Sequence, residues 1–398
     1  FYVDVTELVR EGENVAAVRV KNDLVPNSRW YSGSGIYRDV YLVRTNEIHF
    51  DHFGVRCATN GIYPKQDTAL LQIRAQVVND GGTAENVGVL HKIYDRDGKL
   101  VSTSGIALYL EPGESSDCMV RPTVESPHLW TDEDPYLYTL VSTVVSDGRE
   151  LDSFACKTGI RTAVFDADQG FLLNGETVKI KGMCVHHDCG LTGAVGYRES
   201  WERRLKELKD MGCNGIRCSH NPPAPVLLDL CDELGFLVMD EAFDEWLLAK
   251  NKTDNYYSEN LAYGSSMFFT NHAKEDLTAM LRRDYNHPSV VIWSIGNEIP
   301  EQSSVDGVKI LKFLQDICHQ EDSSRMVTSA CDNIAAVEPI RTLREFENAL
   351  DVVGYNYVGR WRERAETFYE EDRKEYPERR MIGTENPSAG GIRGDYSQ

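Results

Sequence analysis

The first 160 residues alternate apolar and polar positions over short segments, which clusters of Asn, Asp and Gly separate from one another. Alternation with a period of two is typical of β-strands that bury one face. Turn-forming residues between such segments favour hairpins and short loops. The sequence therefore predicts β-structure up to about residue 160, with strands at residues 14–20, 38–43, 70–78, 88–94 and 138–145.

After residue 160 the pattern changes to apolar strands that alternate with helices. Residues 199–211 place Trp201, Leu205 and Leu208 at helical spacing, and a second helix is predicted at residues 224–234. This alternation favours a (β/α)8 TIM barrel, which we expect to be truncated before its eighth strand because the sequence ends soon after the seventh. The strands are predicted at residues 178–185, 214–219, 236–239, 290–294, 326–329, 351–355 and 381–384.

These two patterns divide the chain into three parts, as its length of 398 residues leads one to expect. Residues 1–45 are too few for a domain and are interpreted as the tail of another β domain. Residues 46–160 predict an immunoglobulin-like β-sandwich, and residues 161–398 an incomplete TIM-barrel domain. Because the chain starts without methionine and in the middle of a domain pattern, we expect it to be a piece of a longer protein.

Composition excludes some classes of partner. A formal net charge of -21 argues against nucleic acid or an anionic membrane surface as a partner. The sequence also contains no run of eighteen apolar residues, so no membrane span is predicted. Its ten cysteines are scattered and form no CxxC pair, which favours reduced thiols and a cytoplasmic location.

Polar residues follow nearly every predicted barrel strand. In such barrels the carboxyl ends of the strands and their loops share one face, where active sites form. A polar residue at a single strand end is unremarkable, but their repetition on one face predicts an active site. They are His186, His187, Asp188, Arg217, Ser219, His220, Asn221, Asp240, Glu241, Asn297, Glu298, Asp332, Asn333, Asn356, Tyr357, Glu385 and Asn386.

Two of these residues, Glu298 and Glu385, supply the pair of carboxyl groups that cleavage of a glycosidic bond requires. One carboxyl group must donate a proton to the leaving oxygen, and the other must attack the anomeric carbon or activate water. Trp293 lies near the end of the fourth strand. We expect it to form an apolar wall that raises the pKa of the proton donor.

Several motifs resemble those of glycoside hydrolase family two, which comprises β-galactosidases, β-glucuronidases and β-mannosidases. Residues 287–298 read His-Pro-Ser-Val-Val-Ile-Trp-Ser-Ile-Gly-Asn-Glu and resemble the acid/base signature of this family. Residues 217–223 and 238–244 are similar to two further motifs. Residues 30–38 resemble the closing part of its sugar-binding jelly roll, which would make residues 1–45 the tail of that domain.

The resemblance implies the roles of the two glutamates. Glu298 would be the general acid/base, with Asn297 beside it binding the 2-hydroxyl group of the sugar. Glu385 would be the nucleophile that forms a covalent glycosyl-enzyme, so that the enzyme retains the anomeric configuration. Either Tyr355 or Tyr357 would orient the nucleophile, and Tyr355 is the preferred choice.

The resemblance also implies the residues that bind the sugar. Arg217 and His220 would line the −1 subsite, with Arg217 nearer the nucleophile. His187, Asp240 and Asn356 are further candidate sugar contacts. For Arg217 and His186, a purely structural role is an alternative. Arg217 could simply neutralise strand-end carboxylates, and His186 is interpreted as a packed strand histidine rather than a ligand contact.

One departure from the family concerns a metal ion. Metal-dependent β-galactosidases of the family carry a glutamate and, two residues later, a histidine after the Asp-Glu-Ala motif, and both bind magnesium. The matching residues here are Glu245 and Leu247. Leucine has no atom that ligates a hard cation. We therefore predict no metal ion and no other cofactor.

The leading functional hypothesis is exo-acting hydrolysis of terminal β-galactosides, because Asp-Glu-Ala-Phe-Asp with Trp246 resembles the bacterial β-galactosidases. A β-glucuronidase is the main alternative, and a β-mannosidase is a weaker one. An alternative from another class is a non-catalytic carbohydrate-binding fragment, against which the presence of both Glu298 and Glu385 argues. We expect a small carbohydrate as the partner, and a homo-oligomer of the full-length protein is compatible with the sequence.

Overall fold

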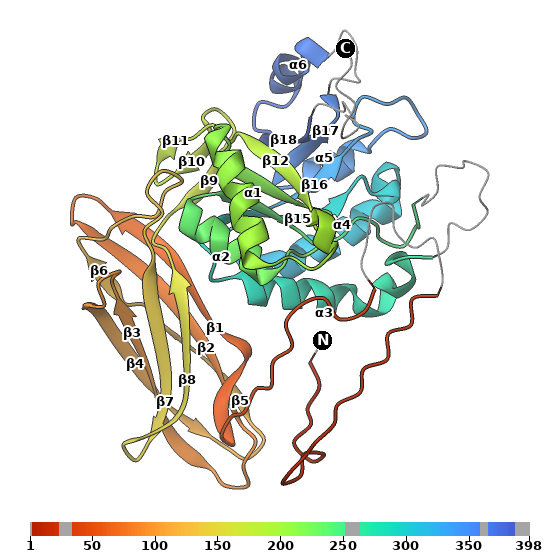
Figure 1. Cartoon of the computed structure of the whole chain (residues 1–398). Coiled ribbons are helices and arrows are strands. Elements are labelled where there is room, and N and C mark those ends of the chain that lie inside the picture. The colour runs from red at the N-terminus through yellow and green to blue at the C-terminus, as the bar shows by residue number, and fades with distance from the viewer. Residues whose placement is uncertain (1, 24–33, 251–262, 359–364, 387–398) are drawn as a thin grey trace.

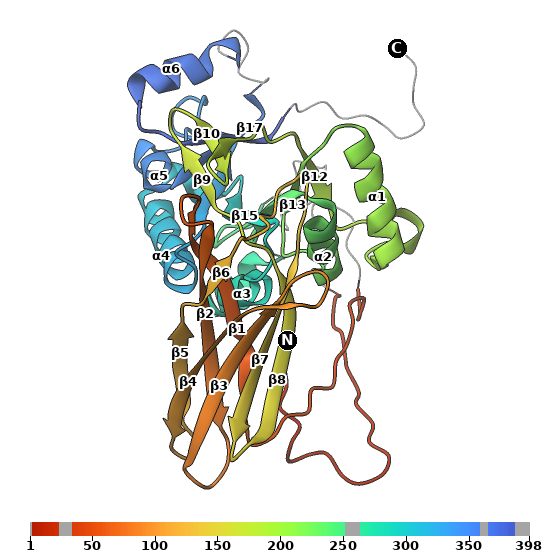
Figure 2. The same ribbon diagram turned by 90° about the vertical axis from the view of Figure 1, so that its left-hand side faces the viewer.

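The computed structural model describes residues 2–23, 34–250, 263–358 and 365–386 (Figure 1). A β-sandwich occupies one end of the molecule, and a parallel sheet surrounded by helices occupies the other (Figures 1 and 2). The prediction of a β-sandwich followed by a TIM-type barrel domain is thus confirmed. Within the described residues, no helix combines the length and the apolar character that crossing a membrane requires.

The N-terminal segment contradicts one prediction. The strands expected at residues 14–20 and 38–43 are absent, and the chain there is extended and exposed (Figure 1). Apolar side chains such as Val15 and Leu42 are 85% and 84% exposed. A strand needs a neighbour to accept and donate its backbone hydrogen bonds, and no neighbouring strand pairs with these described residues. Residues 30–33 of the segment that resembles the end of the jelly roll lie outside the described part of the chain.

Two antiparallel sheets form the sandwich. Along β2 and β7, buried residues alternate with partly exposed ones, as the period of two predicts. One sheet has the order β1-β2-β5, with β6 also paired to β2, and the other has the order β4-β3-β7-β8. The strands are β1 (Ile48–Tyr63), β2 (Thr68–Asn79), β3 (Glu85–Tyr94), β4 (Leu100–Leu110), β5 (Ser115–Val120), β6 (Thr123–Glu125), β7 (Tyr138–Ser146) and β8 (Arg149–Thr158).

A small sheet joins the sandwich to the barrel. Its strands are β9 (Ala163–Asp166), β10 (Gly170–Leu173) and β11 (Glu176–Thr177). Arg161, which precedes it, is buried and donates to the carbonyl oxygens of Pro288 and Val290, at 3.0 and 2.5 Å. Because Val290 begins a barrel strand, the sandwich is attached at the amino ends of the strands, away from the end where an active site forms.

Seven parallel strands follow one another in chain order within the described residues. The first and last of them approach each other, since the Cys184 thiol donates to the carbonyl oxygen of Thr384 at 3.3 Å. The strands are β12 (Gly182–His186), β13 (Gly215–Ser219), β14 (Leu237–Glu241), β15 (Val290–Asn297), β16 (Met326–Cys331), β17 (Val352–Asn356) and β18 (Met381–Glu385).

Helices cover the outer face of this sheet (Figures 1 and 2). The second helix shows how the sequence limits them: Pro225 stands in its first turn, and Gly235 ends it with a φ of 73°. The helices are α1 (Arg198–Asp210), α2 (Pro225–Leu234), α3 (Ser266–Asp284), α4 (Val305–Glu321), α5 (Arg344–Ala349) and α6 (Phe368–Glu375), with 3-10 turns η1 (Gly190–Thr192) and η2 (Pro300–Ser303).

Candidate active site

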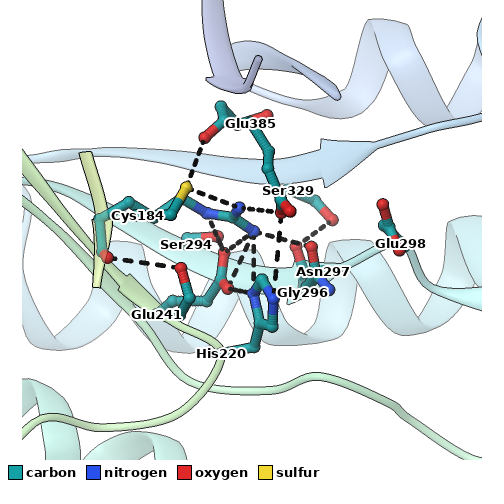
Figure 3. A network of polar contacts seen from close by, with 12 residues as sticks. Cys184, His220, Glu241, Ser294, Gly296, Asn297, Glu298, Ser329 and Glu385 are labelled. Atoms are coloured by element: carbon teal, nitrogen blue, oxygen red, sulfur yellow. Dashed lines mark hydrogen bonds and ion pairs between the residues drawn. The ribbon is translucent and has the colours of Figure 1, made fainter. Parts of the chain in front are cut away.

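Arg217, in β13, is the centre of a buried polar network at the carboxyl ends of the barrel strands. Figure 3 shows this network with Glu241, His220, Asn297 and Glu385 labelled. Its guanidinium group donates to both carboxylate oxygens of Glu241, at 2.8–3.0 Å. It also donates to Glu385 Oε2 at 2.9 Å and to Asn297 Oδ1 at 2.8 Å. A forked pairing of arginine with carboxylate fixes orientation as well as charge. Arg217 therefore both neutralises a buried strand-end carboxylate and contacts the predicted nucleophile.

Glu241 is the buried anchor of this network, and the sequence pattern did not single it out beyond its place at a strand end. Besides Arg217, it accepts hydrogen bonds from His220 Nδ1 at 2.8 Å and from Ser294 Oγ at 2.7 Å. Burial by itself would raise the pKa of Glu241, but Arg217 and His220 outweigh burial and lower it to about 2. The carboxylate is therefore ionised and holds both side chains in place.

Glu385, at the end of β18, lies within the same network (Figure 3). The hydroxyl group of Tyr357 donates to its Oε1 at 2.7 Å, and His220 Nε2 is 3.9 Å from its Oε2. Burial would raise the pKa of Glu385, but the Tyr357 hydrogen bond and the charges of Arg217 and His220 hold it below its ordinary value. Glu385 is thus kept ionised, as a nucleophilic carboxylate must be.

The tyrosine beside Glu385 is Tyr357, which corrects the choice of Tyr355 as the residue that orients the nucleophile. Tyr355 is fully buried, and its hydroxyl group donates to Asp372 at 2.8 Å, on α6. Arg379 donates to the same tyrosine oxygen at 3.3 Å. Tyr355 therefore joins β17 to the helix layer, whereas Tyr357, two residues later, reaches the site.

Glu298 directly follows β15 and is surrounded differently. Its backbone has a φ of 47°, a conformation that side chains other than glycine rarely adopt, and its N–H group donates to the carbonyl oxygen of Ala330 at 2.7 Å. Burial and the nearby charge of Asp332 raise the pKa of Glu298, and the charge of Lys250 opposes them. Figure 3 shows Glu298 apart from the contacts that join Glu241, His220 and Glu385. A raised pKa favours the protonated form of the carboxyl group, as a proton donor requires.

Two asparagines link the acid side of the site to the nucleophile side. Asn297 accepts from Arg217 through Oδ1, and its Nδ2 donates to Asp244 Oδ1 at 2.9 Å. Asn356 donates through Nδ2 to Glu298 Oε1 at 3.1 Å, while its Oδ1 accepts from Thr384 at 2.6 Å. These partners fix the orientation of both amides. Both predicted sugar-binding asparagines therefore lie at the site, and Asn356 also holds Glu298.

The two histidines at the end of β12, His186 within the strand and His187 just after it, correct another prediction. His187, a predicted sugar contact, turns outward: its Nε2 donates to the carbonyl oxygen of Ala194 at 2.9 Å, and its ring packs 5.6 Å from Trp201 of α1. His186 instead lies with its ring 5.0 Å from that of His220, inside the site. Successive side chains of a strand point to opposite faces, so only one of the pair reaches the site. His186, interpreted as a packed histidine, is that one.

Two further predictions fail for the same reason. Asp240 is fully buried on the outer face of β14, where burial and the neighbouring Asp284 raise its pKa. It is therefore not placed to contact a sugar, whereas Glu241 faces inward. Trp293 likewise points away from Glu298: its indole N–H donates to Asp322 Oδ2 at 2.9 Å, beyond the end of α4. Burial of Glu298 thus comes from other neighbours.

Both domains correspond to known protein families. The family model "Glycosyl hydrolases family 2, TIM barrel domain" matches residues 164–390. The chain belongs to glycoside hydrolase family 2. A second model, "Glycosyl hydrolases family 2", matches residues 55–161, which are most of the β-sandwich.

Relatives within family 2 carry two kinds of name. A protein of Bacteroides ovatus named "Beta-galactosidase BoGH2A" is 40% identical over 90% of this chain and 44% of its own length. A "Beta-glucuronidase" of Bacteroides fragilis is 28% identical over 83% of this chain and 47% of its own length. A solved structure of a family 2 member from Bacteroides cellulosilyticus superposes with a TM-score of 0.80 at 36% identity, over 90% of this chain and 43% of that one. The chain spans less than half of each of these proteins.

The family's magnesium ligands are not reproduced here. Glu245 Oε2 accepts a hydrogen bond from the backbone N–H group of Lys250 at 3.0 Å. Its Oε1 accepts hydrogen bonds from the Ser265 hydroxyl group at 3.2 Å and from the backbone N–H group of Ser266 at 3.0 Å. Leu247 offers no ligand atom and is 46% exposed. In the described part of the chain, no group of three His, Cys, Asp or Glu side chains could hold a metal ion. These residues do not fit a divalent cation.

Proposed function

We propose that this family 2 glycosidase is a retaining, exo-acting enzyme that hydrolyses terminal β-galactosides, with Glu298 as acid/base and Glu385 as nucleophile. The observation that carries this proposal is the opposite direction of two pKa shifts at one site. Burial and Asp332 raise the pKa of Glu298, while Tyr357 and Arg217 help to lower that of Glu385. Carboxyl groups whose environments separate their pKa values in this way suit an acid and a nucleophile.

The proposed reaction has two displacements. First, the Glu385 carboxylate attacks the anomeric carbon while Glu298 gives its proton to the leaving oxygen, which yields a covalent glycosyl-enzyme. Glu298, now ionised, then accepts a proton from the water that attacks this ester, and Glu385 leaves as a carboxylate. Two inversions give net retention. Arg217 and Tyr357 stabilise the negative charge of Glu385 before attack and after its release.

Galactose is the proposed sugar because the relative that is 40% identical over 90% of this chain is named a β-galactosidase. A β-glucuronidase is a second candidate, since other relatives and a solved structure from Bacteroides uniformis at 27% identity carry that name. Parallel assays with nitrophenyl β-galactoside, β-glucuronide and β-mannoside distinguish these sugars. A kcat/KM highest for the glucuronide would overturn the choice of galactose and leave the mechanism intact.

Covalent labelling tests the mechanism itself. In the intact enzyme we expect a 2-fluoro glycoside to label Glu385, and Glu385→Gln to abolish the labelling and lower kcat by about 10⁴-fold or more. Glu298→Ala should lower kcat by about 10²–10⁴-fold on substrates with poor leaving groups, and azide should restore part of the rate. Undiminished labelling of Glu385→Gln would overturn the assignment. If the unaltered protein binds sugars but hydrolyses none, it is a carbohydrate-binding protein instead.

A cytoplasmic location is part of the same proposal. All ten cysteines lie within the described residues, and none forms a disulfide. Reduced thiols are typical of the cytoplasm. The excess of negative charge likewise supports a small carbohydrate substrate rather than a nucleic acid or membrane partner.

A further inference from the structure

Lys250 is a buried cation beside the proposed acid/base. Its side chain is 9% exposed, and its Nζ donates to Asp244 Oδ1 at 2.8 Å and to the carbonyl oxygen of Asn297 at 2.5 Å. Asp244 Oδ1 also accepts the amide Nδ2 of Asn297. Lys250 and Asp244 together therefore hold both the backbone and the side chain of the residue that directly precedes Glu298.

The loop after β14 is built to hold this lysine in place. Glu245 Oε2 accepts the backbone N–H group of Lys250, while its Oε1 accepts the N–H group of Ser266 at the start of α3. The carboxylate that corresponds to a magnesium ligand in metal-dependent relatives thus binds N–H donors. A buried ammonium group is stable where a carboxylate and a carbonyl oxygen accept its protons, and Lys250 has both.

The charges that surround Glu298 come from several elements. Asp332, after β16, and Glu385, at the end of β18, add negative charge. Lys250, from the loop after β14, adds positive charge, and Asn356 of β17 donates a hydrogen bond. Charges act more strongly in a buried site than in water. Lys250 therefore offsets part of the negative charge that Asp332 and Glu385 direct at the acid/base.

We propose that Lys250 is the positioning residue of the acid/base in this chain: its fixed ammonium group supplies positive charge in place of the magnesium ion that metal-dependent relatives bind through the glutamate matching Glu245. The inference rests on the proposed role of Glu298. Lys250 does not itself contact the substrate. It orders the turn at Asn297 and Glu298 through the Asn297 carbonyl oxygen, and its charge keeps Glu298 acidic enough to protonate a poor leaving group.

Removal of the charge gives a prediction with a definite sign. Lys250 lowers the pKa of Glu298, so Lys250→Gln should raise it and shift the basic limb of the kcat/KM profile up by about half a unit to one unit. A weaker acid protonates poor leaving groups less well. We expect kcat to fall about tenfold on alkyl glycosides and less than about threefold on dinitrophenyl glycosides, whose leaving groups need no proton.

Matched variants separate charge from structure. Gln keeps a donor for Asp244 and the Asn297 carbonyl oxygen, so Lys250→Gln should fold, as circular dichroism and Tm would check. Lys250→Arg keeps the cation and should restore the basic limb to within a few tenths of a unit. Lys309→Gln, on the exposed face of α4 with 72% of its side chain accessible, should change neither the limb nor kcat. An unshifted basic limb in folded Lys250→Gln would overturn the proposal.

Two further experiments distinguish a failure of this proposal from a failure of the proposed function, and test whether a metal ion is required. Glu298→Gln should show the same selectivity for activated leaving groups, only larger; if it shows none, the acid/base assignment itself fails. If Glu298→Gln shows the selectivity and Lys250→Gln does not, only the role of Lys250 fails. Exhaustive treatment with a chelator should leave kcat unchanged, and a loss that added Mg²⁺ restores would overturn the replacement of the metal by Lys250.

Discussion

The two sides of the site surround the same functional group with opposite charges. Glu385 contacts a guanidinium group, a phenol hydroxyl group and an imidazole, and its pKa falls despite burial. Glu298 lies near the negative charges of Asp332 and Glu385 and accepts a hydrogen bond from the Asn356 amide, and its pKa rises although Lys250 opposes the rise. Figure 3 shows the contrast, with Glu385 inside the network and Glu298 outside it. Environment, rather than residue type, therefore suits one glutamate to attack and the other to donate a proton.

The two sides also differ in how deeply they are anchored. The nucleophile side depends on Glu241, which is 0% exposed and ties Arg217 and His220 to β14. The acid side depends on a turn with positive φ and on residues from loops. We therefore expect substitution of Glu241 to cost both stability and rate, and substitution of the charges around Glu298 to change mainly the pH dependence and the rate on poor leaving groups.

Apart from the two proposed catalytic glutamates, the largest effect is expected for Glu241→Gln, which would weaken the lowering of the Glu385 pKa. A neutral amide leaves Arg217 without its ionic partner in a buried site, so kcat should fall by about 10²–10³-fold. Because Glu241 has a folded-state pKa of about 2 against about 4.5 ordinarily, its ionisation contributes about 3 kcal/mol of stability at pH 7. This stability should be lost as pH falls from about 4.5 towards 2.

Urea unfolding at pH 7 and pH 3 measures this prediction. The stability difference between Glu241→Gln and the unaltered protein should shrink at the lower pH, because at pH 3 the glutamate is protonated in the unfolded state while the folded-state pKa of about 2 keeps it ionised in the native state. Glu207→Gln on the exposed surface of α1 is the control and should change stability by less than about 0.5 kcal/mol. Equal changes in the free energy of unfolding for both substitutions would mean that the Glu241 charge contributes no more to stability than an exposed charge does.

The next largest effect separates the two tyrosines. Tyr357→Phe removes a hydrogen bond to the Glu385 carboxylate, so kcat should fall about 10- to 100-fold. The pKa of Glu385 should rise, and the acid limb of the kcat/KM profile should move up with it, since the nucleophile must be ionised. Tyr355→Phe instead removes a donor from buried Asp372 and should cost about 1–3 kcal/mol of stability with less than about a threefold change in kcat. The reverse result would restore Tyr355 as the orienting residue.

Topology explains why much of the site is predictable from the sequence. Parallel strands bring their carboxyl ends to one edge, so a polar residue at a strand end is placed there without any knowledge of packing. Arg217, His220, Asn297 and Glu385 all lie in the network that this rule predicts. The N-terminal strands show the opposite case. Their alternation is correct as a local pattern, but a strand also needs a partner, which the pattern does not supply.

The sequence does not show which residues of each barrel strand point inward. His186 and His187, like Asp240 and Glu241, are adjacent polar residues of which one faces the site. Barrel strands are buried on both faces, as in β14 and β15, so apolar residues do not mark which face is inner. Tyr355 and Tyr357 would point to the same face by strand alternation, but Tyr357 lies beyond the end of β17 and has a φ of 56°, so it points into the site instead. No sequence pattern predicts the position of Lys250, because it lies in a loop whose path brings it to Asn297.

The smallest effect is expected for a substitution near Glu298, on the acid side of the site. Asp332→Asn removes a charge that raises the pKa of Glu298, while its amide oxygen can still accept from Gln302. Glu298 must be protonated for the first step, so activity is lost as pH rises through its pKa. The basic limb should therefore move down by a fraction of a unit, with kcat changed less than about threefold.

The sign of this shift tests the contrast between the two sides more directly than its size. Asp332→Asn and Lys250→Gln remove opposite charges near the same carboxyl group, so their effects on the basic limb should oppose each other. In the double variant the limb should return close to that of the unaltered enzyme if the two charges act independently. The acid limb, which Glu385 sets, should stay in place in all three variants, and Asp306→Asn on exposed α4 should move neither limb. A shift of the acid limb in Asp332→Asn would mean that this charge acts on the nucleophile, and that the two sides are not electrostatically separate.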